Sequence, residues 1–63
     1  MPLVEITLYS GRTDAQKNAI ARRVSVALIE EGGAAPDSVH VIFRDCERHD
    51  WLKSRELLDN DDR

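Results

Sequence analysis

Residues 2–17, PLVEITLYSGRTDAQK, join two kinds of local structure in one short stretch. The first part, Leu3–Tyr9, alternates apolar and polar side chains and contains β-branched residues, which predicts a half-buried strand. Ser10–Gly11 then interrupts the strand pattern. Thr13, with Gln16 three residues later, has the spacing of a capping box, which predicts that a helix begins directly after it. The stretch therefore predicts a strand followed at once by a helix.

The helix is expected to run to about Glu31 and to end at Gly32–Gly33. Its sheet-facing positions are expected at spacings of three and four residues, namely Ala15, Ala19, Ile20, Val24, Ala27, Leu28 and Glu31. Pro36 disfavours helix at the residue before it, which predicts a loop there.

A second strand is predicted over Val39–Asp45, with one face formed by Val39, Val41 and Phe43 and the other by His40, Ile42 and Arg44. Strand, helix and strand in this order predict an α/β fold, a single βαβ unit with two parallel strands. The segment after Glu47 fits a short hairpin or, because it is rich in helix formers, a helical turn. We expect one domain over residues 1–63, with a frayed acidic tail at residues 59–63.

Chain length and composition predict self-association. A domain of 63 residues buries only about 60% of its unfolded surface, and one helix leaves a face of the sheet uncovered. Cys46 is the only cysteine, so no disulfide forms within the chain, and we expect a reducing, cytoplasmic setting. The net charge of -3 and the scattered basic residues argue against nucleic-acid binding. No apolar run is long enough for a membrane span, and no signal peptide is expected.

The chain resembles the 4-oxalocrotonate tautomerase family. The resemblance is carried by Pro2 after Met1, by GRTDAQK at residues 11–17 and by PDSVHVI at residues 36–42. It implies βαβ subunits that pair into dimers, three of which form a hexamer. It also implies enol–keto tautomerisation of a small unsaturated 2-oxo acid without a cofactor or metal, and removal of Met1 to leave Pro2 as the amino terminus.

Pro2 and Arg12 are the catalytic candidates that the resemblance implies. A free α-amine has a pKa of about 7.7–8.0, and apolar surroundings or a nearby cation such as Arg12 disfavour its charged form. A base with a pKa near the working pH suits proton transfer. The planar guanidinium of Arg12 suits a carboxylate, and in the family this arginine often reaches in from a neighbouring subunit.

Five further residues are expected to bind substrate: Leu3, Tyr9, Ser38, His40 and Trp51. Ser38 matches a serine of the family, but His40 stands where the family has a second arginine. Histidine is mostly uncharged near neutral pH and makes no forked pair with a carboxylate. We therefore expect a monoacid such as a phenylpyruvate-like enol to suit the site better than a diacid, with Arg44 as a candidate to compensate.

The segment around Trp51 also departs from the family. Trp51 stands where the family has an aromatic residue that closes the site, although a sole tryptophan also suits a subunit interface. Lys53 replaces the water-activating glutamate of the dehalogenase relatives, which argues against their chemistry. Cys46, His40 and His49 are too few and too widely spaced for a closed zinc site.

Two other functions fit the same residues. The change at His40 and the altered C-terminal segment also fit a catalytically weak oligomeric scaffold or binding module. A nucleophilic secondary amine in an apolar pocket would also permit addition chemistry through an enamine or imine.

Overall fold

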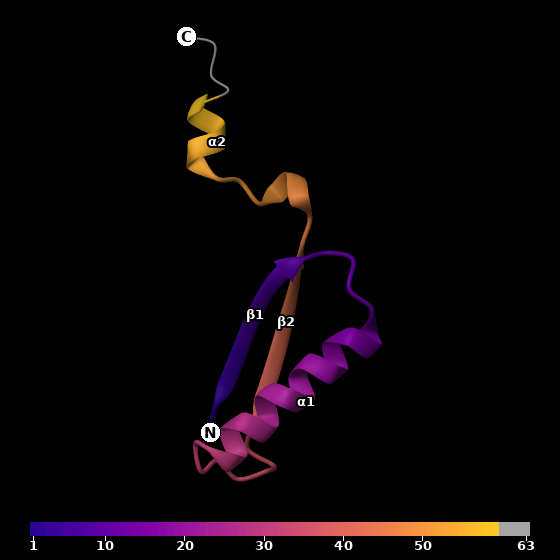
Figure 1. The fold of residues 1–63 in the computed structure, drawn as a ribbon, viewed down its shortest axis with the longest axis vertical. Coiled ribbons are helices and arrows are strands. Elements are labelled where there is room, and N and C mark those ends of the chain that lie inside the picture. The colour runs from indigo at the N-terminus through magenta and orange to yellow at the C-terminus, as the bar shows by residue number, and fades with distance from the viewer. Residues whose placement is uncertain (60–63) are drawn as a thin grey trace.

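The computed structural model describes residues 1–59 and confirms the predicted βαβ unit (Figure 1). Its elements are β1 (Leu3–Tyr9), α1 (Asp14–Glu30), β2 (His40–Cys46), a 3-10 turn η1 (Arg48–Asp50) and α2 (Ser54–Asp59). β1 and β2 form a two-stranded parallel sheet, in which Leu3 lies opposite His40 and Tyr9 opposite Cys46. This register fixes which residues share each end of the sheet.

The capping box at the start of α1 is formed as predicted. The backbone N–H of Gln16 donates to Oγ1 of Thr13 at 3.1 Å, and the backbone N–H of Thr13 donates to Oε1 of Gln16 at 2.9 Å. These two bonds satisfy donors that the first turn of a helix leaves without partners. At the other end, Gly33 has a φ of 72°, a left-handed conformation that glycine adopts at helix ends.

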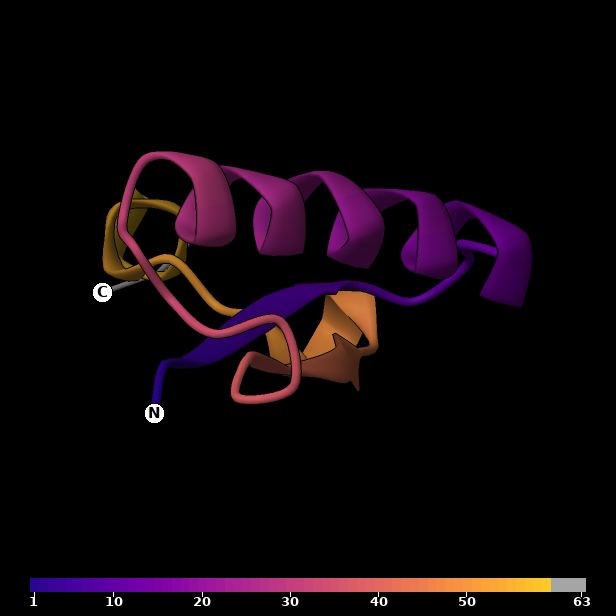
Figure 2. The same ribbon diagram turned by 90° about the horizontal axis from the view of Figure 1, so that it is seen from below.

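α1 lies along one face of the sheet (Figure 2). In β1 the side chains of Val4, Ile6 and Leu8 are half-buried, whereas those of Leu3, Glu5 and Thr7 are exposed. The helix positions that are half-buried are Lys17, Ile20, Ala21, Val24, Ser25, Leu28 and Ile29. The prediction was therefore right for Ile20, Val24 and Leu28 and wrong for Ala15, Ala19, Ala27 and Glu31, all four of which are exposed. The prediction also missed Lys17, Ala21, Ser25 and Ile29, so the half-buried stripe is rotated around the helix relative to the predicted one.

β2 begins one residue later than predicted. The backbone N–H of His40 donates to the carbonyl oxygen of Pro2 at 3.0 Å, and regular pairing starts at this residue rather than at Val39. The predicted alternation is confirmed, since His40, Ile42 and Arg44 are exposed and Val41 and Phe43 are half-buried.

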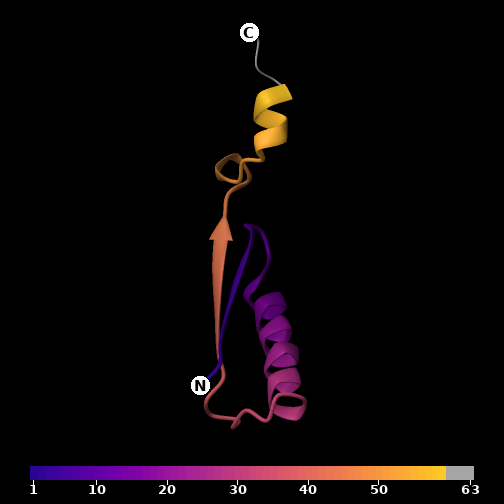
Figure 3. The same cartoon turned by 90° about the vertical axis from the view of Figure 1, so that its left-hand side faces the viewer.

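The C-terminal segment is helical, so the helical alternative is correct and the hairpin is not formed in the described residues. η1 and α2 extend past the ends of the strands and away from α1 (Figures 1 and 3). The radius of gyration, 16.6 Å, far exceeds the roughly 10.6 Å of a compact chain of this length. Asp59 ends α2, and the rest of the predicted acidic tail lies outside the described residues.

No side chain among residues 1–59 is fully buried. On the sheet face that α1 leaves uncovered, Leu3 is 52% exposed and Ile42 is 41% exposed. Within residues 1–59, no helix is long and apolar enough to cross a membrane. Because no side chain of residues 1–59 is fully buried and apolar side chains stay exposed on the uncovered sheet face, the described part of one chain does not complete a hydrophobic core by itself.

Candidate active site

The predicted site residues lie in two groups at opposite ends of β1. Pro2, Leu3, Ser38 and His40 lie at or near the end where the strand begins, and Tyr9, Arg12 and Trp51 lie at the end where it stops. The seven residues of β1 span six steps of about 3.3 Å, which separates the two groups by roughly 20 Å. A small substrate cannot span this distance, so the predicted site residues of one chain form two separate groups, which we term the first and the second half-site.

The first half-site is organised by the sheet. Pro2 is half-buried, and its carbonyl oxygen accepts the backbone hydrogen bond from His40. Leu3 lies opposite His40 in the register, and both side chains are on the exposed face of the sheet. The hydroxyl of Ser38 donates to the carbonyl oxygen of Ala35 at 2.8 Å, which engages it in the loop that precedes β2. The structure thus brings Pro2, Leu3 and His40 together.

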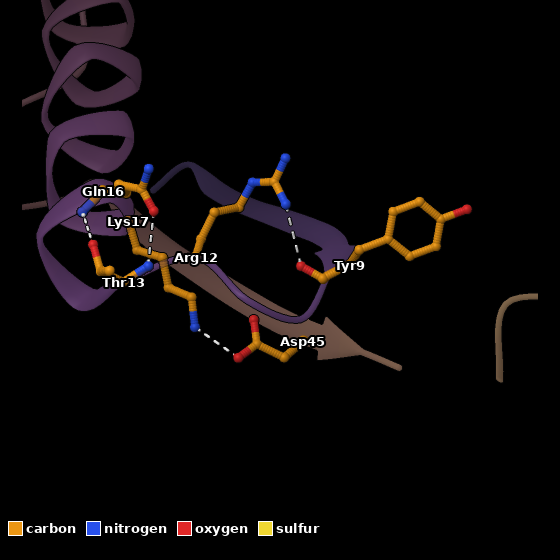
Figure 4. Close-up of polar contacts among 6 residues, drawn as sticks. All are labelled: Tyr9, Arg12, Thr13, Gln16, Lys17 and Asp45. Carbon is orange, nitrogen blue, oxygen red and sulfur yellow. Dashed lines mark hydrogen bonds and ion pairs between the residues drawn. The ribbon is translucent and has the colours of Figure 1, made fainter. Parts of the chain in front are cut away.

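The second half-site begins at the turn between β1 and α1 (Figure 4). Gly11 has a φ of 124°, in the range that favours glycine. The next residue, Arg12, is exposed, and its Nη1 donates to the carbonyl oxygen of Tyr9 at 3.4 Å. Lys17 forms an ion pair with Asp45 at 2.8 Å, which connects the first turns of α1 to the end of β2. Turn and ion pair together position Arg12 beside Tyr9.

An aromatic cluster completes the second half-site. The ring centroids of Tyr9 and Trp51 are 4.6 Å apart at an interplanar angle of 48°. The Cζ atom of Arg48 lies 4.3 Å from the centroid of the Tyr9 ring. A cavity of about 440 Å³ adjoins this cluster and is lined by Arg48, Trp51, Leu52, Lys53, Glu56 and Leu57. Its volume is within the range of small-molecule sites.

Arg48 is the residue of this cluster that sequence reasoning missed. The signal for it is the strand register, because Tyr9 lies opposite Cys46 and Arg48 follows two residues later. Arg44, the candidate to compensate for His40, is instead paired with Glu5 at 2.6 Å on the exposed sheet face.

Cysteine, histidine and acidic side chains do not gather into a metal site in the described part of the chain, where no group of three or more is placed to hold an ion. The Sγ atom of Cys46 donates to the carbonyl oxygen of Glu47 at 3.6 Å, and His49 lies 3.7 Å from Asp50.

Comparison with known proteins relates this arrangement to one family. A family model described as "Tautomerase enzyme" matches residues 2–57. A probable tautomerase from Streptococcus pneumoniae serotype 4 is 39% identical over 57 residues, which are 90% of this chain and 95% of that protein. A 2-hydroxymuconate tautomerase from Pseudomonas putida is 39% identical over 51 residues, 81% of each chain.

The solved structures agree with the sequence comparisons. The structure of a 4-oxalocrotonate tautomerase isozyme from Methylibium petroleiphilum matches with a TM-score of 0.77 at 35% identity, over 82% of this chain and 84% of that chain. Since a family model spans nearly the whole chain and its relatives share both sequence and fold, this βαβ protein belongs to the 4-oxalocrotonate tautomerase-like enzymes of the tautomerase family.

Proposed function

We propose that the chain is a cofactor-independent tautomerase that interconverts the enol and keto forms of unsaturated 2-oxo acids, with Pro2 as the proton-transferring group. The observation that carries the proposal, beside family membership, is the environment of Pro2. Its carbonyl is held by His40 while Met1 on its other side is 91% exposed. Removal of Met1 would therefore create a free secondary amine at a position that the sheet already defines.

The proton transfer needs only the substrate and this amine. A backbone amide nitrogen is not a base, whereas the amine of an N-terminal proline accepts a proton. Pro2 would take the proton of the 2-hydroxyl group as the electrons of the double bonds shift, and would return a proton to a carbon of the conjugated chain. Substrate and product have the same atoms, so no oxidant, reductant or cofactor is required.

Arg12 is proposed to bind the substrate carboxylate. Its guanidinium is exposed, and among residues 1–59 no carboxylate lies within ion-pair distance of it. Its fork of N–H donors matches a carboxylate, and the same donors would stabilise negative charge as it develops on the 2-oxo group. The paired rings of Tyr9 and Trp51 would form an aromatic wall at the same end of β1.

The active site is proposed to form between subunits, with Pro2 of one chain facing Arg12 of another. The separation of the half-sites supports this arrangement. So does the accessible surface of 5299 Å², against about 4,100 Å² for a compact monomer of this mass. An excess of this size is enough for a stable interface. Dimers, and a hexamer made of three dimers, would bury the sheet face and bring the half-sites together.

A scaffold without significant turnover is the second candidate function. It is favoured by His40, which places no permanent cation beside Pro2 where the family has an arginine. In that case the chain would assemble but would not accelerate ketonisation.

The decisive experiment compares Pro2→Ala with wild type in the ketonisation of phenylenolpyruvate and 2-hydroxymuconate. Intact mass must first confirm that Met1 is absent. We expect the substitution to lower kcat/KM at least roughly 100-fold, because it removes the general base. Pro36→Ala, in the loop before β2, is the matched control and should keep the wild-type rate. A Pro2→Ala rate equal to wild type would refute the proposal, and an inactive wild-type oligomer would favour the scaffold.

A further inference from the structure

Two guanidinium groups meet Tyr9 at different parts of the residue. Nη1 of Arg12 donates to the Tyr9 carbonyl oxygen at 3.4 Å, and Cζ of Arg48 lies 4.3 Å from the centre of the Tyr9 ring. The ring points away from Arg12 (Figure 4). The two cations therefore lie at the backbone and at the side chain of the same residue, separated by it rather than stacked on one another.

Arg48 retains hydrogen-bonding capacity in this position. An arginine placed over an aromatic ring presents its face to the ring and keeps the N–H donors at its edge for other partners. In residues 1–59 four ion pairs are formed, and none of them involves Arg48. Arg48 also lines the cavity beside Trp51. It thus presents donors that no ion pair of the described residues occupies to an open pocket beside Trp51.

Other cations near the predicted site are less suitable. Arg44 is engaged by Glu5 at 2.6 Å on the sheet face. Lys53 lines the cavity together with Arg48, but an ammonium group lacks the planar fork that binds a carboxylate through two bonds.

We infer that Arg48 is a substrate-specificity residue. It is the second carboxylate-binding group of the site and binds the carboxylate for which His40 offers no forked donor. The inference rests on the proposed function, because Arg12 is the first carboxylate-binding group. An Arg48 in this role reverses the preference for a monoacid over a diacid that His40 alone led us to expect. With Arg12 at the backbone of Tyr9 and Arg48 over its ring, the site would favour an unsaturated 2-oxo diacid over a monoacid of similar size.

Trp51 allows binding to be measured without turnover. It is the only tryptophan of the chain, it contacts Tyr9 and it lines the cavity with Arg48. Adipate and hexanoate are unreactive six-carbon acids that differ by one carboxylate. We expect Trp51 fluorescence titration of wild type lacking Met1 to show adipate binding roughly 10-fold more tightly than hexanoate, as one charge-assisted hydrogen-bonding group implies.

Four variants test whether Arg48 causes the preference for adipate over hexanoate. Arg48→Gln should abolish it, and Arg48→Lys should restore it only in part, since the charge returns without the fork. Arg55→Gln should leave it unchanged, because Arg55 is 89% exposed, pairs with Asp59 and does not line the cavity. If Lys53→Gln rather than Arg48→Gln abolished the preference, the assignment to Arg48 would be wrong. Size-exclusion chromatography of each variant verifies that assembly is unchanged.

Steady-state kinetics separate a specificity role from a structural one. Arg48→Gln should raise KM for 2-hydroxymuconate roughly 10-fold while kcat, and both constants for phenylenolpyruvate, stay near wild type. An equal loss with both substrates would show that Arg48 only holds the C-terminal segment in place, which would overturn the inference. An Arg48-dependent preference for adipate without turnover of either substrate would support the binding role and refute the tautomerase proposal instead.

Discussion

The backbone N–H of His40 donates to the carbonyl oxygen of Pro2, with the two atoms 3.0 Å apart. This is the first hydrogen bond between β2 and the residues that lead into β1. It involves the carbonyl group of Pro2, whereas the proposed chemistry involves the nitrogen of Pro2. It depends on the backbone of His40 and not on its imidazole. The position of Pro2 therefore does not depend on which side chain stands at residue 40.

Gly11 provides a test of how the turn positions Arg12. A Cβ at this residue would have no atom within 4 Å, so Gly11→Ala adds no clash, but its φ of 124° lies outside the left-handed helical region and the strain should cost more than about 1 kcal/mol of stability. A Cβ at Gly33, at the far end of α1, would also have no atom within 4 Å, so Gly33→Ala is the matched control. Urea unfolding at one protein concentration should show a loss for both variants, larger for Gly11→Ala because Gly33, at a φ of 72°, is closer to the left-handed helical region. Only Gly11→Ala should also lower kcat/KM, and equal activities would contradict the positioning role.

The ion pair between Lys17 and Asp45 should contribute measurably to stability. Their side chains are 19% and 42% exposed, whereas those of Arg55 and Asp59 are 89% and 66% exposed. Double-mutant cycles with Lys17→Met and Asp45→Asn should give a coupling of about 0.5–1 kcal/mol. The cycle for Arg55 and Asp59 should stay below roughly 0.3 kcal/mol, because that pair is solvated and in the less favourable order along a helix. Equal couplings would contradict this ranking.

Ile42 tests whether the uncovered sheet face is a subunit interface. Its side chain is 41% exposed in the single chain and alternates with those of the half-buried Val41 and Phe43, which puts it on the face that α1 does not cover. Ile42→Asp would bury a charge in such an interface, so light scattering should show a shift from oligomer to smaller species. Ile42→Val keeps the apolar character and should assemble normally. Assembly of Ile42→Asp at wild-type concentration would place the interface elsewhere.

The sequence predicted the local structure well where one signal dominated. Strand alternation placed β1 over Leu3–Tyr9, and the spacing of Thr13 and Gln16 placed the start of α1 at Asp14. The start of β2 was less predictable, because it depends on the hydrogen bond between His40 and Pro2, which are distant in sequence. The C-terminal segment was ambiguous between hairpin and helix because propensity alone distinguishes them weakly.

The candidate site was less predictable than the fold. The sequence motif identified Pro2 and Arg12 as catalytic candidates. Their spacing in the sequence does not show that they lie at opposite ends of a strand that is roughly 20 Å long. Arg48 was missed because its contact with Tyr9 joins segments that approach one another only through the register of the two strands. A sequence gives the identity of each residue, but the distance between two residues of a sheet is known only once the pairing of the strands is known.

Mixing two inactive variants tests the shared site most directly. Pro2→Ala and Arg12→Ala chains, each carrying a different affinity tag and lacking Met1, are co-expressed and the mixed oligomers are purified through both tags. If Pro2 of one chain faces Arg12 of another, some sites in the mixture combine an intact Pro2 with an intact Arg12, and ketonisation activity returns. Mixed oligomers that remain as inactive as either variant alone, although wild type is active, would contradict the account.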